Sequence, residues 1–302
     1  MKKIFILGVG AQKAGTTWLH RQLIKSANFN FGHRKEYHVF DSIEKLNDPS
    51  REKGNYSILN NCISSIIDSH SNWTLGRNIN KGQRRYQAID LSFLDNIENY
   101  FEYFNYLYLK DETVQAVGDI TPQYALLKQE TFQLIKEGLE KRGFDIKVIF
   151  LMRDPAERAW SAAKYRKRNM TTKQLERFDE VKFLRRQIST SGNSNKSRYE
   201  DTIRNLENVF DKQNIYYEFY ERLFLPESQA RLQDFLELQL FNFDGSEVIN
   251  STSKDNLLPS DINEVLVTEF QSTYDFLRHR YGKTIVNLWQ GYKHDGSVKG
   301  TN

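Results

Sequence analysis

The segment at residues 3–19 constrains the fold of this chain more than any other. Residues 3–9 contain a continuous apolar run, Ile-Phe-Ile-Leu-Gly-Val, which is typical of a strand buried in a parallel sheet. The run leads into a loop bounded by Gly10 and Gly15, and a helix is expected from Thr16 onward. Such a loop binds phosphate, because backbone N–H groups and the positive end of a helix meet there. The segment therefore predicts a phosphate site at the edge of an α/β sheet.

The loop differs in one respect from the Walker A loop of nucleotide hydrolases, which reads G-x-x-x-x-G-K-[ST]. Gly10 and Gly15 keep the spacing of that motif, and Thr17 fills its hydroxyl position. Thr16, however, stands where the lysine is expected, and Lys13 lies inside the loop instead. The sequence thus predicts that a phosphorylated nucleotide binds in a manner unlike that of an ordinary ATPase.

Strands alternate with helices along most of the chain. We expect further strands at residues 114–117, 147–152 and 215–219, and a short strand or extended segment at 36–40. We expect helices at residues 16–26, 58–67, 93–109, 122–141, 155–168, 176–188, 199–211, 227–239 and 259–281. The alternation predicts an α/β fold with three layers, α/β/α, around a central and mainly parallel sheet. This architecture is similar to that of P-loop nucleotide hydrolases, with helical insertions.

The 302 residues show no internal repeat and no linker, so we expect a single domain over residues 1–302. Residues 42–113 are interpreted as a helical insertion, and residues 290–302 as a mobile tail. Aromatic side chains crowd residues 93–108, where we expect mainly core packing, although some could line a ligand cleft.

Composition excludes several classes of protein. The net charge of +4 is spread along the chain without a dense basic run, so no nucleic-acid partner is expected. The single cysteine and the spacing of the six histidines argue against a metal site. No apolar run approaches the roughly 18 residues of a membrane span. The short apolar run after Met1 also argues against a signal peptide. A soluble, cytoplasmic setting is therefore expected.

A second candidate phosphate segment begins at Arg153, directly after an apolar strand. Ligands of open α/β sheets bind at the carboxyl ends of strands. Ser161 lies two turns into the following helix, on the same side as Arg158. A guanidinium and a hydroxyl that converge suit a phosphate group. Taken alone, the pattern R-D-P-x-x-R would be better explained by a capped helix with a surface ion pair.

Together, the two segments resemble those of sulfotransferases that use 3′-phosphoadenylyl sulfate (PAPS). In that family a Q-K-x-G-T-T-x-L loop holds the 5′-phosphosulfate, and a later R-D-P-x-x-R-x-x-S segment holds the 3′-phosphate. This chain has Q-K-A-G-T-T-W-L at residues 12–19 and R-D-P-A-E-R-A-W-S at residues 153–161. The resemblance implies cofactor contacts from Gln12, Lys13, Ala14, Gly15, Thr16, Thr17, Trp18, Arg153 and Ser161.

Some of these assignments have alternatives. Lys13 is expected to meet the charge of the leaving phosphate and so to act in catalysis, whereas Trp18 could instead serve packing alone. Related enzymes carry a basic residue on a late loop to the 3′-phosphate, and Lys254 is the candidate here. A plain solvated loop explains Lys254 equally well.

Weaker matches, over roughly residues 1–240, resemble the heparan-sulfate branch of the family. K-E-Y-H-V-F-D at residues 35–41 resembles its K-E-x-H-F-F-D segment, and G-D-I-T-P-Q-Y at 118–124 resembles its G-E-x-[ST]-P-x-Y turn. This resemblance implies that Glu36 is the catalytic base, with His38 as an orienting group or an alternative base. The chain departs from the branch at Asp119, where glutamate is usual, and at Tyr165, where many members have histidine.

The resemblance implies an enzyme that moves a sulfuryl group from PAPS to a hydroxyl, or less readily an amine, of an acceptor. The acceptor is expected to be a small molecule or a glycan, with a carbohydrate favoured. Residues 42–113 are expected to shape the acceptor cleft. The product of the donor is adenosine 3′,5′-bisphosphate (PAP), and no metal is required. Two alternatives stay open: a P-loop nucleotide kinase, and a nucleotide-binding scaffold without turnover. The sequence leaves the oligomeric state open.

Overall fold

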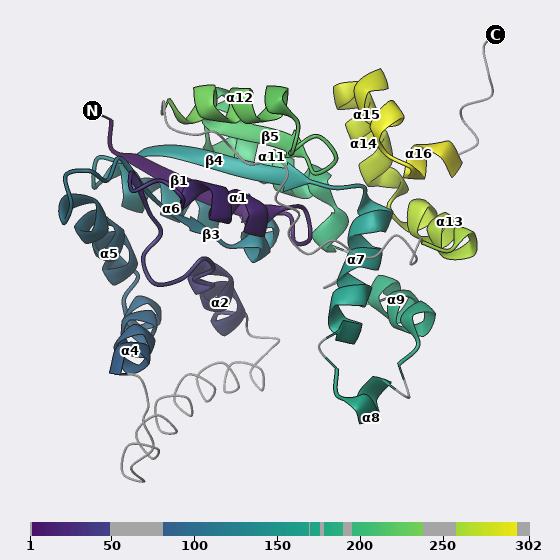
Figure 1. Ribbon diagram of the computed structural model, residues 1–302, viewed down its shortest axis with the longest axis horizontal. Coiled ribbons are helices and arrows are strands. Elements are labelled where there is room, and N and C mark those ends of the chain that lie inside the picture. The colour runs from purple at the N-terminus through teal and green to yellow at the C-terminus, as the bar shows by residue number, and fades with distance from the viewer. Residues whose placement is uncertain are drawn as a thin grey trace.

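A computed structural model describes residues 2–48, 81–168, 170–175, 178–189, 195–237 and 258–294. Its strands pair in parallel in one sheet of order β2-β3-β1-β4-β5, which Figure 1 shows flanked by helices. The strands are β1 (Ile4–Gly10), β2 (Phe29–Asn30), β3 (Ala116–Ile120), β4 (Asp145–Met152) and β5 (Ile215–Phe219). The expected α/β class with a central parallel sheet is therefore confirmed.

Helices make up most of the remaining described chain. The longer ones are α1 (Thr16–Leu23), α2 (Val39–Leu46), α4 (Lys81–Asp95), α5 (Glu98–Leu109), α6 (Gln129–Glu140), α7 (Pro155–Arg168), α9 (Glu180–Ser189), α11 (Tyr199–Val209), α12 (Pro226–Leu236), α13 (Ser260–Glu269) and α14 (Gln271–Tyr281). Short ones are α8 (Thr172–Leu175), α15 (Lys283–Leu288), α16 (Gly291–His294), and the 3₁₀ turns η2 (Pro122–Leu126), η3 (Asn195–Ser197) and η4 (Lys212–Asn214). Within the described ranges, none of the helices combines the length and the apolar character needed to cross a lipid bilayer.

The central strands are buried and mainly apolar, although β3 contains Asp119 and β4 contains Asp145 and Lys147. Every residue of β1 and β3 is buried, and in β4 only Asp145 is partly exposed. Such two-sided burial is characteristic of parallel sheets with helices on both faces. The aromatic cluster of α4 and α5 belongs to this core, since Phe93, Tyr100, Phe101 and Phe104 are all buried. Core packing is thus confirmed for these four side chains.

The sequence predicted a short strand or an extended segment at residues 36–40, and the structure has no strand there. The strand at this edge of the sheet is β2, residues 36–38 have no regular secondary structure, and α2 begins at Val39, directly after His38 in a left-handed conformation (φ +55°). The backbone N–H of Tyr37 donates to the side chain of Thr121 (3.0 Å). The N–H of Tyr37 is therefore paired with a side chain from the loop after β3 and not with a neighbouring strand.

Two long helices predicted from periodicity are each divided in two. The helix expected at 93–109 is broken at residues 96–97, where the Asn96 side chain accepts a hydrogen bond from the N–H of Glu98 and so begins α5 (3.0 Å). The stretch before it is also helical, since α4 begins at Lys81. The helix expected at 259–281 is broken at Phe270, whose backbone leaves the helical region.

Two further expectations need correction. The helix expected from Pro122 starts as the 3₁₀ turn η2, and α6 begins only at Gln129. Part of the tail at 290–302 is ordered, since residues 291–294 form α16 and Tyr292 is buried, donating a hydrogen bond to the carbonyl of Tyr274 (2.6 Å). The helix expected at 58–67 lies outside the described residues.

Candidate active site

A cavity of about 560 Å³ opens at the carboxyl edge of the sheet. Parallel strands bring the loops that follow them to this edge, so segments far apart in the sequence meet there. The cavity is lined by ten of the expected site residues: Gln12, Lys13, Gly15, Thr16, Thr17, Trp18, Glu36, His38, Arg153 and Ser161. Ala14 does not line it, because its side chain is buried in the core. Lys254 lies outside the described residues.

The loop between β1 and α1 has the backbone of an anion cradle. Gly15 precedes α1 with φ +93°, a conformation that favours glycine. Lys13 has φ +72°, which is uncommon for a residue with a side chain and is found preferentially at functional sites. The first N–H groups of α1 have no partner within the helix and are available to a ligand. The N–H of Ala14, by contrast, already donates to the carbonyl of Ala11 (3.1 Å).

Positive charge is concentrated around Lys13. Burial and then the charges of Arg168, Arg153 and Lys35 lower the pKa of the Lys13 ammonium group to about 8. Its Nζ lies 4.2 Å from the centre of the Tyr165 ring, a cation–π contact from α7. Cations that lower the pKa of Lys13 in this way favour an anionic ligand.

The second candidate phosphate segment, residues 153–161, lies at the start of α7. The carboxylate of Asp154 accepts a hydrogen bond from the N–H of Ala156 (3.0 Å), as expected for the residue that caps this helix. Arg153 lies just before it, with its guanidinium 4.8 Å from the centre of the Tyr220 ring and 3.2 Å from the carboxylate of Glu157. The guanidinium thus contacts the ring of Tyr220, and its Nη2 donates a hydrogen bond to Glu157.

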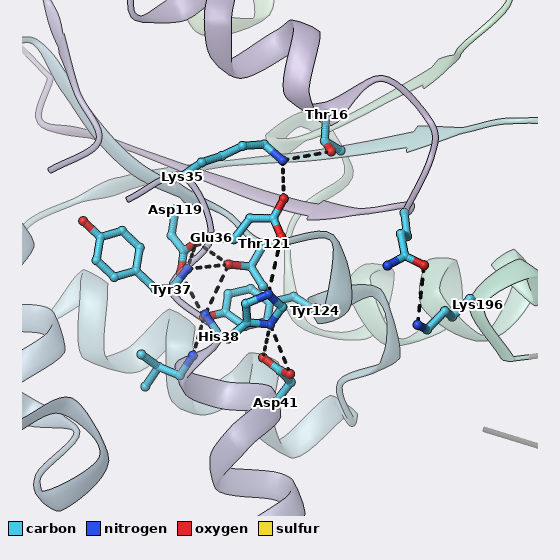
Figure 2. A network of polar contacts seen from close by, with 12 residues as sticks. Thr16, Lys35, Glu36, Tyr37, His38, Asp41, Asp119, Thr121, Tyr124 and Lys196 are labelled. Carbon is cyan, nitrogen blue, oxygen red and sulfur yellow. Dashed lines mark hydrogen bonds and ion pairs between the residues drawn. The ribbon is translucent and has the colours of Figure 1, made fainter. Parts of the chain in front are cut away.

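The segment between β2 and α2 supplies a chain of alternating charges, shown in Figure 2. Lys35 donates to Thr16 (3.3 Å) and to Glu36 (2.5 Å). His38 joins two carboxylates, since its Nε2 lies 3.4 Å from Glu36 and its Nδ1 lies 3.2 Å from Asp41. Asp41 in turn pairs with a lysine on the next turn of α2. Glu36 therefore lies between two cationic groups.

This arrangement sets the charge of both candidate bases. Burial raises the pKa of Glu36, but hydrogen bonds and charge from His38 and Lys35 outweigh it and lower the pKa to about 2. Hydrogen bonds to Asp41 and then to Glu36 raise the pKa of His38 to about 9, although burial opposes them. At neutral pH, Glu36 is an anion and His38 is a cation.

A buried carboxylate at the end of β3 supports the Glu36–His38 segment. Asp119 accepts hydrogen bonds from Thr121 (2.6 Å), Tyr124 (2.9 Å) and Tyr100 (3.0 Å). Burial raises the pKa of Asp119 to about 6 even though these hydrogen bonds act in the opposite direction. The hydroxyls of Thr121 and Tyr124 also accept the N–H groups of Tyr37 (3.0 Å) and Val39 (3.1 Å), respectively. The backbone on both sides of His38 is thus tied to Asp119.

Sequence reasoning missed several residues of the cavity. Tyr220 directly follows β5, so the rule that ligands bind at the carboxyl ends of strands could have indicated it. Lys196 also lines the cavity, with its Nζ 3.5 Å from the side-chain oxygen of Gln12. No motif or spacing marked Lys196, because it comes from a short 3₁₀ turn after residues 191–194, which lie outside the described residues.

The chain belongs to the sulfotransferase family, since it matches the family model described as "Sulfotransferase domain" over residues 2–279. Among solved structures, it is similar to a sulfotransferase from Alicyclobacillus acidocaldarius, at 17% identity and a TM-score of 0.53, over 92% of this chain and 95% of that chain. It is also similar to the sulfotransferase STF9 from Mycobacterium avium (14% identity, 91% of this chain and 76% of that chain, TM-score 0.45).

A third similar structure is the sulfotransferase domain of the Synechococcus PCC 7002 olefin synthase (16% identity, 80% of this chain and 76% of that chain, TM-score 0.42). No curated protein matches the sequence. Of these three structures, the one from Alicyclobacillus has a TM-score above 0.5. At 17% identity, this likeness shows a shared fold.

We predict that Asp119→Asn lowers the free energy of unfolding by about 2 kcal/mol, because the amide cannot replace the charged acceptor shared by three buried hydroxyls. Urea denaturation measures this loss. The control is Asp201→Asn, since Asp201 forms an exposed ion pair with Arg204 and its replacement should change stability by less than about 0.5 kcal/mol. Equal midpoints for the two variants would show that Asp119 does not anchor the segment.

Proposed function

We propose that this protein transfers a sulfuryl group from PAPS to a hydroxyl group of a carbohydrate acceptor, with an amine as the less favoured alternative. The supporting observation is that both phosphate segments and Glu36 line one cavity. Sulfotransferases normally use PAPS as the donor.

The charges of the cavity fit this donor. Among the described residues that line it, five are lysine or arginine and one, Glu36, is a carboxylate. PAPS carries negative charge at both ends of its ribose, and the two cationic segments lie at different strand ends. In this proposal Arg153 and Ser161 bind the 3′-phosphate, while Lys13 and the N–H groups at the start of α1 bind the 5′-phosphate.

Bound PAPS would supply an activated sulfuryl group whose leaving group is PAP. The acceptor oxygen forms a bond to sulfur, the bond from sulfur to the bridging phosphate oxygen breaks, and that oxygen keeps the electron pair. Lys13 stabilises the charge that develops on this oxygen. The remaining groups position the reactants, which is the main source of catalysis in transfers of this type.

Glu36 takes the proton of the acceptor hydroxyl. His38 is already protonated at neutral pH, so it cannot be the base, and it holds the Glu36 carboxylate in place instead. A carboxylate with a pKa of about 2 is a weak base. It therefore accepts the proton late, when the oxygen is already bonding to sulfur and the hydroxyl has become strongly acidic.

The donor assignment is tested by calorimetry with PAP in the absence of Mg²⁺. We expect the protein to bind PAP, and Arg153→Ala to weaken that binding by about tenfold to a hundredfold, through loss of a charged contact to the 3′-phosphate. The control Arg204→Ala removes an arginine that is 60% exposed and should leave the affinity unchanged. Tight binding of Mg-ATP without any response to a 3′-phosphate would refute the proposal and favour a kinase.

The base is tested with labelled PAPS and a panel of glycans. Glu36→Gln should reduce turnover by about 10²- to 10⁴-fold, because the amide cannot accept the proton, while PAP affinity stays unchanged. Glu227→Gln, an exposed position in the first turn of α12, provides the matched control. Full activity of Glu36→Gln would assign the proton transfer to another group, and absence of product from the wild-type protein would indicate a binding scaffold.

The low pKa of Lys13 predicts a pH dependence. Only the protonated ammonium group can stabilise the leaving phosphate, so kcat/KM for PAPS should fall about tenfold per pH unit above pH 8. The kcat profile should fall only at higher pH, because the negative charge of bound PAPS raises the pKa of Lys13. Lys13→Arg should remove the decline, since a guanidinium stays protonated. A kcat/KM that is flat between pH 7 and pH 10 would contradict the assignment.

A further inference from the structure

The chain next to Arg153 is held by groups from the far C-terminal part of the described structure. The carboxylate of Asp154, the residue after Arg153, accepts hydrogen bonds from the hydroxyl of Tyr274 (2.5 Å) and from the N–H of Gly291 (2.9 Å). Figure 1 shows the helices that carry these groups, α14 to α16, next to the start of α7. The proposed transfer gives these helices no task.

Glu221 connects the same helices to the backbone of Asp154. One oxygen of its carboxylate accepts a hydrogen bond from the N–H of Asp154 (3.3 Å), and the other accepts one from Nε1 of Trp289 (3.0 Å). Trp289 is fully buried, so its N–H depends on this acceptor. An ionised carboxylate suits two N–H groups because both of its oxygens accept, whereas an amide or a protonated carboxyl presents a hydrogen to one of them.

The backbone around Arg153 is fixed at three consecutive residues. The carbonyl of Met152 accepts a hydrogen bond from the N–H of Tyr220 (2.7 Å), and the carbonyl of Arg153 accepts one from the hydroxyl of Tyr199 (2.8 Å). The N–H of the next residue donates to Glu221. This last contact continues into the C-terminal helices, so it relates their packing to the position of the Arg153 side chain.

The ionisation of Glu221 sets the strength of the connection. Burial raises the pKa of Glu221 to about 7, and the charge of Asp154, which faces it from the start of α7, acts in the same direction. Tyr199 faces it from α11 as a neutral phenol. A carboxylate accepts stronger hydrogen bonds than a carboxylic acid does. The connection is therefore strongest above pH 7 and weakens as the pH falls below that value.

We propose that Glu221, together with Trp289, is a positioning residue for the nucleotide. The pair connects the packing of α14 to α16 to the placement of the Arg153 guanidinium against the 3′-phosphate. This inference rests on the proposed function, in which Arg153 binds that phosphate. Neither Glu221 nor Trp289 lines the cavity, so both act through the backbone next to Arg153. Trp289 lies beyond residues 2–279, so the connection brings in a part of the chain outside the match to the family model.

Calorimetry with PAP at pH 8 tests the connection. We expect Trp289→Phe, which removes the N–H and keeps an aromatic ring, to weaken PAP binding by about three- to tenfold, and Glu221→Gln to do the same. In an Arg153→Ala background, both substitutions should leave the affinity unchanged, because they act through Arg153. The control Tyr292→Phe removes a buried hydroxyl of the same helices, whose hydrogen bond goes to the carbonyl of Tyr274, and should keep wild-type affinity.

A pH profile separates this role from a purely structural one. The advantage of the wild-type protein over Glu221→Gln in PAP affinity should be largest at pH 8 and should shrink toward pH 6, where Glu221 is protonated. Both proteins bind the same nucleotide, so the ratio of their affinities cancels the titration of its phosphates. A ratio that stays constant over this range would contradict the role of the Glu221 charge.

Two further results would overturn the proposal. One is wild-type affinity in both Glu221→Gln and Trp289→Phe. The other is a loss of PAP affinity that is equally large in the Arg153→Ala background. Failure of the wild-type protein to bind PAP would refute the proposed function instead. Hydrogen exchange measured without nucleotide then decides on the connection, because Trp289→Phe should speed the exchange of the amides at residues 153–158, and unchanged exchange would rule the connection out.

Discussion

The parallel pairing of β1 with β3 and β4 is the constraint on which the rest of the structure depends. Because these strands run in one direction, the loops after them all open at the same edge of the sheet. The phosphate loop after β1, the Thr121 turn after β3, Arg153 after β4 and Tyr220 after β5 meet there. An antiparallel strand at any of these places would carry its loop to the opposite edge. The site is thus a consequence of strand direction, combined with the few residues that follow each strand.

The support of Glu36 shows how the core and the site are joined. Tyr100 comes from α5 and packs among the aromatic rings of the core, and its hydroxyl donates to Asp119 at the end of β3. Asp119 and its hydroxyl partners then hold the backbone on both sides of His38. The α5 part of residues 42–113 therefore belongs to the core that supports the Glu36 segment. The same contacts explain why the carboxylate of Asp119 is buried although it does not line the cavity.

Local patterns predicted the parts of the chain whose structure is set by local sequence. The apolar run of β4 and the capping pair Asp154-Pro155 each specify their structure within a few residues, and the strand and helix found there agree. Residues 36–40 could not be assigned in this way, because their partner is a side chain more than 80 residues away. Lys196 could not be predicted at all, since its place in the cavity depends on the packing of η3 against α7 and not on any repeated spacing.

The balance of charge in the cavity argues for an anionic ligand. A donor with anionic groups at both ends compensates Lys13 and Arg153, which lie at the ends of different strands. Glu36 is compensated within the protein by Lys35 and His38, so it cannot neutralise any further cation. Arg158 and Lys196 add positive charge to the cavity wall, and Nη1 of Arg158 is buried without a hydrogen-bond partner among the described residues. Burial of positive charge without a partner lowers stability, and an anionic ligand that binds in this cavity offsets part of that cost.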